Sequence, residues 1–255
     1  MKRALIGFLV LAVLAYIGFP LAVAQYQSAS LDPAFFESAI VAFEEGDRES
    51  PPEPGGIIFV GSSSIRFWDT LEADMAPLPA VERGFGGAHM AHVLYNADRI
   101  ILPYAPQAVV VYAGDNDLAK GSGKTAEDVT RDFQQLVTQL RAAQPGLPIY
   151  FITIKPSTLR WDRWPEMDRA NRQIAALAQS DPHLSILDIA TPMLGPTGQE
   201  PRSELFALDG LHLSDAGYQM WTEVVRAQLM KDWATENIGE QSSGMLKTSE
   251  HAEPQ

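Results

Sequence analysis

Five short apolar runs, separated by stretches with helical spacing, constrain this chain more than any other feature of its sequence. The runs lie at residues 56–60, around Val81, and at 108–113, 148–154 and 184–189. Each is apolar nearly throughout rather than alternating, which is typical of strands that are buried on both faces. Strands of this kind, separated by helices, predict a parallel sheet covered on both sides, with functional groups at the carboxyl ends of the strands.

Apolar residues spaced three and four apart indicate the helices between these strands. Helices are expected over 33–45, over 125–143, around Ile174 and from Ser214 onward. Thr125 and Asp128 have the spacing of a capping box, and Ser214 is the expected N-cap of the last helix. We interpret 55–232 as one folded domain, 25–54 as an N-terminal helix and linker, and the polar residues 233–255 as a mobile tail.

The first 24 residues have the organisation of an export signal. Lys2 and Arg3 precede an apolar run over 4–24, and the small residues Ala22 and Ala24 fit cleavage after Ala24. The run is also long enough, at about 20 residues, to span a bilayer if it is retained. We expect the rest of the chain to lie outside the cytoplasm, periplasmic or secreted, with membrane contact only if this segment stays as an anchor.

Composition excludes several classes of function. The chain has 19 Lys and Arg against 32 Asp and Glu, a net charge of −13, which disfavours binding to nucleic acid. It has no cysteine, which removes disulfides, thiolate metal sites and cysteine nucleophiles. His89 and His92 are three residues apart, but no carboxylate completes a metal site of the usual pattern, so we expect neither a metal nor an organic cofactor.

A serine follows the first predicted strand at a place suited to a nucleophile. The stretch is FVGSSSIRFW, in which Gly61 ends an apolar run and the serines open a helix. The helix N-terminus offers free N–H groups to a developing anion. Such a serine needs a base, and His212 qualifies because Asp209, three residues earlier, can orient its imidazole. Taken alone, this pair is equally well read as a loop aspartate and a capping histidine.

A third segment with polar residues follows the strand at 108–113. Asn116 either donates its amide to an oxyanion or ends the strand in an Asx turn. Gly123 and Lys124 resemble part of a phosphate-binding loop, but Leu118 stands where that pattern requires a glycine. We therefore favour the reading in which Lys124 belongs to a surface turn.

Four segments in order resemble the SGNH (GDSL-type) hydrolases, in their acetylhydrolase-like branch. They are GSSS at 61–64, RGFGG at 83–87, GDND at 114–117 and DGLH at 209–212. The resemblance covers most of the chain between Gly56 and Trp221 and implies a flavodoxin-like, three-layer α/β/α fold with a five-stranded parallel sheet. It also implies a serine esterase that acts on small-molecule esters, forms an acyl-enzyme and needs no cofactor.

The resemblance assigns roles to five residues. Ser63 matches the nucleophile, His212 its base and Asp209 the residue that orients the base. Ser63, Gly87 and Asn116 match the positions whose N–H groups form the oxyanion hole. Short acyl groups, of the acetyl type, are the expected substrates.

Two positions depart from the family pattern. Ser62 stands where the family usually has Asp, and Glu82 where it often has Asn. Ser62 can still cap the helix that Ser63 opens. The substitution leaves open the alternative of a catalytically silent ligand-binding protein on the same fold. Phe85, Trp161 and Trp164 are the candidates for lining the substrate pocket, although apolar residues near a sheet edge also serve packing alone.

Overall fold

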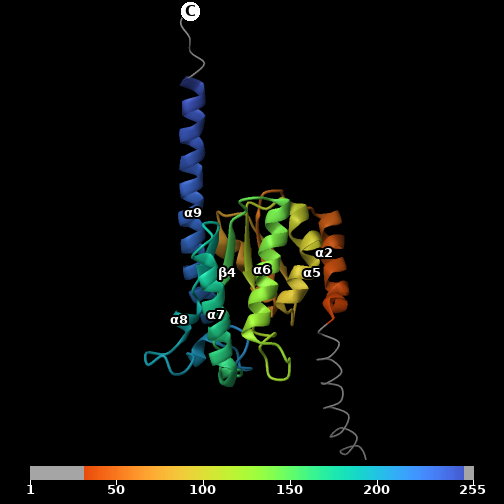
Figure 1. Cartoon of the computed structure of the whole chain (residues 1–255), viewed down its shortest axis with the longest axis vertical. Coiled ribbons are helices and arrows are strands. Elements are labelled where there is room, and N and C mark those ends of the chain that lie inside the picture. The colour runs from red at the N-terminus through yellow and green to blue at the C-terminus, as the bar shows by residue number, and fades with distance from the viewer. Residues whose placement is uncertain (1–31, 250–255) are drawn as a thin grey trace, which may run out of the picture.

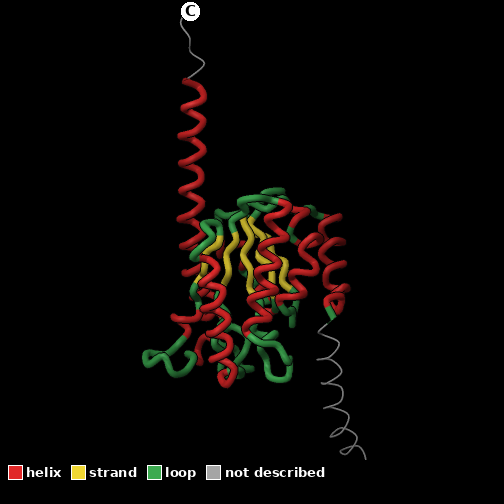
Figure 2. The backbone as a smooth tube through the Cα atoms, in the orientation of Figure 1, coloured by secondary structure: helices red, strands yellow, loops and turns green. Residues whose placement is uncertain are grey.

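A five-stranded parallel sheet forms the centre of the computed structural model, which describes residues 32–249. The strands are β1 (Ile57–Gly61), β2 (Ala80–Gly84), β3 (Ala108–Tyr112), β4 (Ile149–Ile152) and β5 (Leu184–Leu187), in the order β2-β1-β3-β4-β5. Helices cover both faces of the sheet (Figures 1 and 2). The predicted three-layer architecture and all five predicted strands are confirmed.

The helices before, between and after the strands are of two lengths. The long ones are α2 (Glu37–Glu49), α5 (Met90–Ile100), α6 (Ala126–Ala143), α7 (Trp164–Ala178) and α9 (Asp215–Ser249). The short ones are α3 (Ser63–Arg66), α4 (Leu71–Met75) and α8 (Ala190–Met193), with 3₁₀ turns η1 (Pro33–Phe36), η2 (Leu102–Tyr104), η3 (Trp161–Arg163) and η4 (Ser203–Leu205). The capping box of Thr125 and Asp128 at the start of α6 is confirmed.

The core consists of two apolar clusters, one on each face of the sheet. Successive side chains of β3 alternate between them: Val109 and Val111 face α2, α5, α6 and α7, whereas Val110 and Tyr112 face α4 and α9. Every residue of β1 and β3 is buried. This two-sided burial is the physical reason for the unbroken apolar runs in the sequence.

The central strands β1 and β3 define the point where function is expected. After β1 the chain adds β2 on one side and then crosses to add β3 on the other, which makes their carboxyl ends a topological switch point. Gly61, the last residue of β1, lies beside Tyr112 of β3. A Cβ on Gly61 would lie 1.8 Å from the Tyr112 carbonyl oxygen, so only glycine permits this approach.

The helix α9 extends into the segment 233–255, which is predicted to be a mobile tail. It continues to Ser249, and residues 250–255 lie outside the described residues. The polar composition of this segment is compatible with a helix because Glu, Gln and Lys are good helix formers, and no proline occurs in it before Pro254. Within residues 32–249 we find no helix long and apolar enough to cross a membrane. The predicted export segment lies outside the described range.

Candidate active site

Ser63 lies at the carboxyl end of the central strand β1, where it is the first residue of α3. Ser62 precedes it in an extended conformation and occupies the N-cap position. The expectation that the Ser62 side chain caps α3 is wrong, since it makes no capping hydrogen bond. Its hydroxyl is buried in the turn and has no partner among the described residues.

Ser63, His212 and Asp209 form one chain of hydrogen bonds. Ser63 Oγ lies 3.1 Å from His212 Nε2, across 149 positions of sequence. His212 Nδ1 lies 2.6 Å from Asp209 Oδ2. A carboxylate only accepts, so Nδ1 carries the hydrogen, Nε2 is left as the acceptor and the Ser63 hydroxyl donates to it. The fold therefore brings the three predicted residues together in the order that a nucleophile, a base and an orienting carboxylate require.

The Asp209 carboxylate is held in its ionised form. Burial acts to raise its pKa, but hydrogen bonds from the Leu211 N–H, the His212 ring and the His212 N–H outweigh this effect and lower the pKa to about 2. The ring of Phe67 packs edge-on against the imidazole, with the centroids 5.0 Å apart. His212 is thus oriented by a carboxylate on one nitrogen and by an aromatic ring on its side.

The two other positions assigned to the oxyanion hole lie in turns that follow β2 and β3. Gly87 has a φ of +83°, a conformation that favours glycine. Asn116 Nδ2 donates to the Ala88 carbonyl oxygen at 3.1 Å, which links the two turns. Asn116 Oδ1 accepts from Arg160 at 3.0 Å. Because Arg160 has only donors, this contact fixes which end of the amide carries the N–H groups.

Sequence reasoning missed three charged residues behind this site. Arg160 and Lys155 both contact Asp115, at 3.2 and 3.1 Å. Burial acts to raise the pKa of Asp115, but the two cations outweigh it and lower the pKa overall, whereas burial lowers the pKa of Lys155. The signal was weak because a lysine just after an apolar run has the same appearance in sequence as a surface lysine.

The resemblance to a phosphate-binding loop has a structural explanation. Lys124 Nζ lies 3.0 Å from Asp117 and 3.4 Å from Asp132, so its charge is already paired. Asp117 in turn accepts the N–H of Met90 at 3.0 Å, at the start of α5. Lys124 therefore stabilises the turn after β3.

The His92 side chain stabilises the start of α5, at the position of His89. His92 Nδ1 accepts the N–H of His89 at 2.9 Å. Both side chains are buried, and burial is the main cause that lowers the pKa of each to about 4. Among the described residues there is no group of three His, Cys, Asp or Glu side chains that could hold a metal ion.

The candidates for lining the pocket separate into two groups. Phe85 is 1% exposed and packs edge-on against Phe36 in the core, so the expectation that it contacts substrate is corrected. Trp161 and Trp164 are half-buried and stack on each other, with centroids 6.2 Å apart and planes 11° apart. Trp161 directly follows Arg160, and the contact of both tryptophans with substrate stays a prediction.

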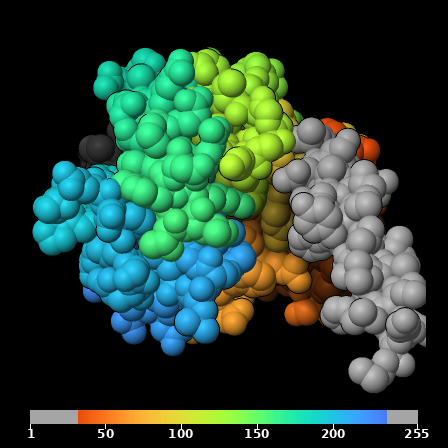
Figure 3. Space-filling view, turned by 90° about the horizontal axis from the view of Figure 1, so that it is seen from below, coloured from red at the N-terminus to blue at the C-terminus, as the bar shows by residue number. Residues whose placement is uncertain are grey.

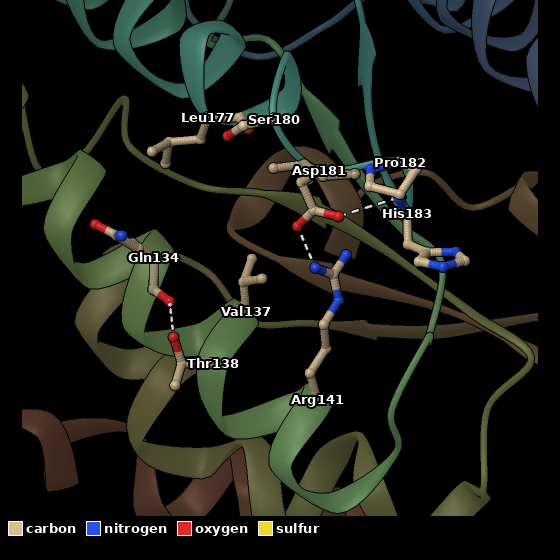
Figure 4. Close-up of a pocket in the computed structure, with 10 residues that line it drawn as sticks. Gln134, Val137, Thr138, Arg141, Leu177, Ser180, Asp181, Pro182 and His183 are labelled. Atoms are coloured by element: carbon tan, nitrogen blue, oxygen red, sulfur yellow. Dashed lines mark hydrogen bonds and ion pairs between the residues drawn. The ribbon is translucent and has the colours of Figure 1, made fainter.

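Figure 3 shows the face at which the strands end. Segments from the orange, green and blue parts of the chain adjoin there. A concavity lies at the amino ends of the strands, between α6, α7 and the turn before β5 (Figure 4). It contains the ion pair of Arg141 with Asp181, and Asp181 also accepts the N–H of His183 at 3.0 Å. These contacts close the turn before β5.

Comparison with known proteins assigns the chain to a family. The GDSL-like lipase/acylhydrolase family matches residues 59–220, which is more than half of the chain. The chain belongs to this family. It is therefore an ester hydrolase, in agreement with the resemblance of its four motifs. None of the curated proteins matches the chain.

Solved structures share the fold at low sequence identity. A candidate platelet activating factor from Streptococcus pneumonia has 20% identity and a TM-score of 0.70, covering 82% of this chain and 99% of its own. A GDSL-like lipase from Bacteroides thetaiotaomicron has 16% identity and a TM-score of 0.67, with coverages of 76% and 98%. An acetyl xylan esterase has 16% identity and a TM-score of 0.58, with coverages of 68% and 98%.

Proposed function

We propose that this ester hydrolase cleaves short-acyl esters of small molecules through a Ser63 acyl-enzyme. The observation that carries the proposal is the hydrogen-bonded chain from Ser63 Oγ through His212 to Asp209, with contacts of 3.1 and 2.6 Å. The residues come from two turns that are far apart in the sequence and meet at the switch point of the sheet.

Acylation begins when Ser63 Oγ attacks the ester carbonyl carbon and His212 Nε2 takes the hydroxyl proton. The carbonyl oxygen becomes an oxyanion, which the N–H groups of Ser63, Gly87 and Asn116 stabilise. Asn116 Nδ2 has two hydrogens and uses one on Ala88, so the second can serve the oxyanion. Collapse of this intermediate expels the alcohol, which receives the proton from His212 and leaves the acyl group on Ser63.

Deacylation repeats these steps with water as the nucleophile. His212 Nε2 takes a proton from the water as the oxygen attacks the acyl carbon, and it returns the proton to Ser63 Oγ when the acid departs. Asp209 keeps the imidazole in the required tautomer and stabilises its protonated form throughout. Its depressed pKa supports this role, because the carboxylate stays ionised at neutral and mildly acidic pH.

The preference for short acyl groups is supported by the resemblance to acetylhydrolases and by the fold shared with an acetyl xylan esterase. A series of aryl esters with acyl chains from two to twelve carbons tests it directly. We expect kcat/KM to be highest for the acetyl or propionyl ester. A maximum at eight carbons or more contradicts the preference while leaving the proposed mechanism intact.

Covalent labelling tests the mechanism. The purified protein is treated with a small fluorophosphonate, and the label is located by fragment mass spectrometry. We expect a single label on Ser63 that is absent from the His212→Ala variant. Label spread over Ser62, Ser63 and Ser64 in both proteins shows that none of the serines is activated.

We also propose that the protein acts outside the cytoplasm, on the strength of the export signal in residues 1–24. Fractionation of cells that express the full chain, with N-terminal sequencing of the product, tests this. Recovery outside the cytoplasm with Gln25 as the first residue is the expected result. Recovery of the uncleaved chain in the cytoplasm contradicts it.

A further inference from the structure

A buried lysine at the carboxyl end of β4 joins two turns of the proposed active site. Lys155 is 1% exposed, and its Nζ donates to Ser64 Oγ at 3.0 Å, to the Tyr112 hydroxyl at 2.9 Å and to Asp115 Oδ2 at 3.1 Å. An ammonium group has three hydrogens, so these three contacts account for all of them. The three hydrogen bonds hold the Lys155 side chain in one position.

The partners of Lys155 lie next to the residues assigned to catalysis. Ser64 directly follows Ser63 in the turn after β1, and Asp115 directly precedes Asn116 in the turn after β3. One ammonium group therefore connects the turn that carries the nucleophile with the turn that carries an oxyanion donor. Lys155 itself has no exposed surface through which it could touch a substrate.

The energetics of the buried ion pair between Lys155 and Asp115 favour a geometric role over a purely stabilising one. Removing two charges from water costs several kcal/mol per ion, and apolar side chains of similar volume often stabilise such a place as well or better. The buried pair of Lys155 and Asp115 lies between two functional turns and has an effect that apolar packing does not have. It fixes distance and direction, and a misplacement of about 1 Å in an active site can cost 10²-fold in rate.

We propose that Lys155, acting with Asp115, is a positioning residue that sets the spacing between Ser63 Oγ and the Asn116 amide. The proposal rests on the function proposed above. Arg160 strengthens the same connection from the next turn of the loop, since it contacts both Asp115 and Asn116. The loop after β4 thus acts as a brace behind the nucleophile and the oxyanion donor.

Two serines that flank Ser63 provide a matched test. Both are fully buried, but Ser64 Oγ accepts from Lys155, whereas Ser62 Oγ has no partner within the described part of the chain. We expect Ser64→Ala to slow fluorophosphonate labelling of Ser63 and to lower kcat by about tenfold, with KM within about threefold. Ser62→Ala is expected to leave both rates unchanged.

A second variant removes the Lys155 ammonium and the Asp115 charge together, and leaves Arg160 its contacts with the Asp115 carbonyl and Asn116 Oδ1. In the double variant Lys155→Met with Asp115→Asn we expect kcat to fall by about 10²-fold while KM changes by less than about threefold. Arg141→Met serves as the control for stability, because it breaks the ion pair with Asp181 at the amino ends of the strands, away from the proposed active site (Figure 4). It is expected to lower the melting temperature without changing kcat.

The outcomes separate this inference from the proposed function. One outcome requires that wild type and Ser62→Ala are labelled and hydrolyse esters normally. If the Lys155 double variant then reacts at the wild-type rate, whatever its melting temperature, Lys155 is structural only and the inference is wrong. Equal rates in Ser64→Ala and Ser62→Ala overturn it in the same way. If wild type neither labels nor hydrolyses esters, the proposed function fails first, and the inference falls with it.

Discussion

Asn116 has an amide whose two ends face different groups. Its oxygen accepts from Arg160 and its nitrogen donates to the Ala88 carbonyl, and Arg160 is the one side chain of the two partners. Replacing Asn116 with Ala is expected to lower kcat by about 10²–10³-fold, the usual cost of losing one oxyanion donor.

Arg160→Met is expected to lower kcat by about tenfold, because the amide keeps its donor but loses the contact that orients it. Arg163→Met is the matched control: Arg163 lies in the same loop and donates to the Leu118 carbonyl rather than to Asn116. Steady-state kinetics with an aryl acetate measures all three variants. Equal losses in Arg160→Met and Arg163→Met contradict an orienting role.

Asp209 links the site to stability as well as to rate. Its pKa of about 2 in the folded protein lies below the ordinary value of about 3.9, so its contribution to the free energy of unfolding is fully present above pH 4. The contribution is lost as the pH falls through about 2. We expect Asp209→Asn to be less stable than wild type at pH 7, and the difference to vanish near pH 2.

Urea unfolding at a series of pH values measures this difference for Asp209. The same variant is expected to lose about 10⁴-fold in kcat at pH 7, because the imidazole then adopts the wrong tautomer. A stability difference that persists unchanged to pH 2 shows that the carboxylate is not held in its ionised form.

The sequence was most informative about functional residues that lie directly after a predicted strand or beside the last helix. Ser63, Asn116 and Asp209 could be proposed because the motifs around them sit where strands or the last helix begin or end. Lys155 could not, since its burial depends on strands and turns distant in the chain. Ser62 was misjudged for a related reason: the position of a cap is visible in sequence, but the direction of its side chain is not.

At the scale of single elements, the start of α5 depends on two neutral histidines. Burial lowers the pKa of His89 and His92 to about 4, below the ordinary value of about 6.5. The unfolded chain therefore binds more protons than the folded one between these values. Stability is fully present above pH 6.5 and falls as the pH drops towards 4.

The size of this effect is about 3 kcal/mol for each histidine, since one pKa unit corresponds to about 1.4 kcal/mol. Urea unfolding between pH 7.5 and 4 is expected to show a loss of stability that is smaller in His92→Gln. His183→Gln is the control, because His183 is exposed in the turn before β5. A slope that is the same in all three proteins shows that the α5 histidines do not titrate as described.

The apolar periodicity of the sequence predicted the types of the elements, but it did not predict where α9 ends. The strands and the helix α6 were predictable because apolar spacing records which faces are buried. Beyond Trp233 the sequence of α9 has no such apolar spacing, and the helix continues because of the helix propensity of its residues. The helix start is fixed by Ser214, whose hydroxyl accepts from the Gly217 N–H at 3.2 Å. Helices that leave the core have no apolar face from which their ends could be read.

At the scale of the whole molecule, α9 has two parts with different relations to the core. Trp221, Val225 and Leu229 are buried in the cluster on one face of the sheet. Beyond them the helix projects past the edge of the domain, as Figure 1 shows for the blue end of α9. The free energy of folding is therefore concentrated in the first turns of this helix.

Truncation tests this division of α9. A chain that ends at Ala234 retains every residue of the cluster, so we expect its melting temperature and kcat to match those of the full chain within error. Leu229→Ala, in the part that is kept, is expected to cost about 2–5 kcal/mol because it opens a cavity under the sheet. If the truncated chain instead loses stability or activity, the projecting turns take part in folding or in self-association, and size-exclusion chromatography of the two chains distinguishes these cases.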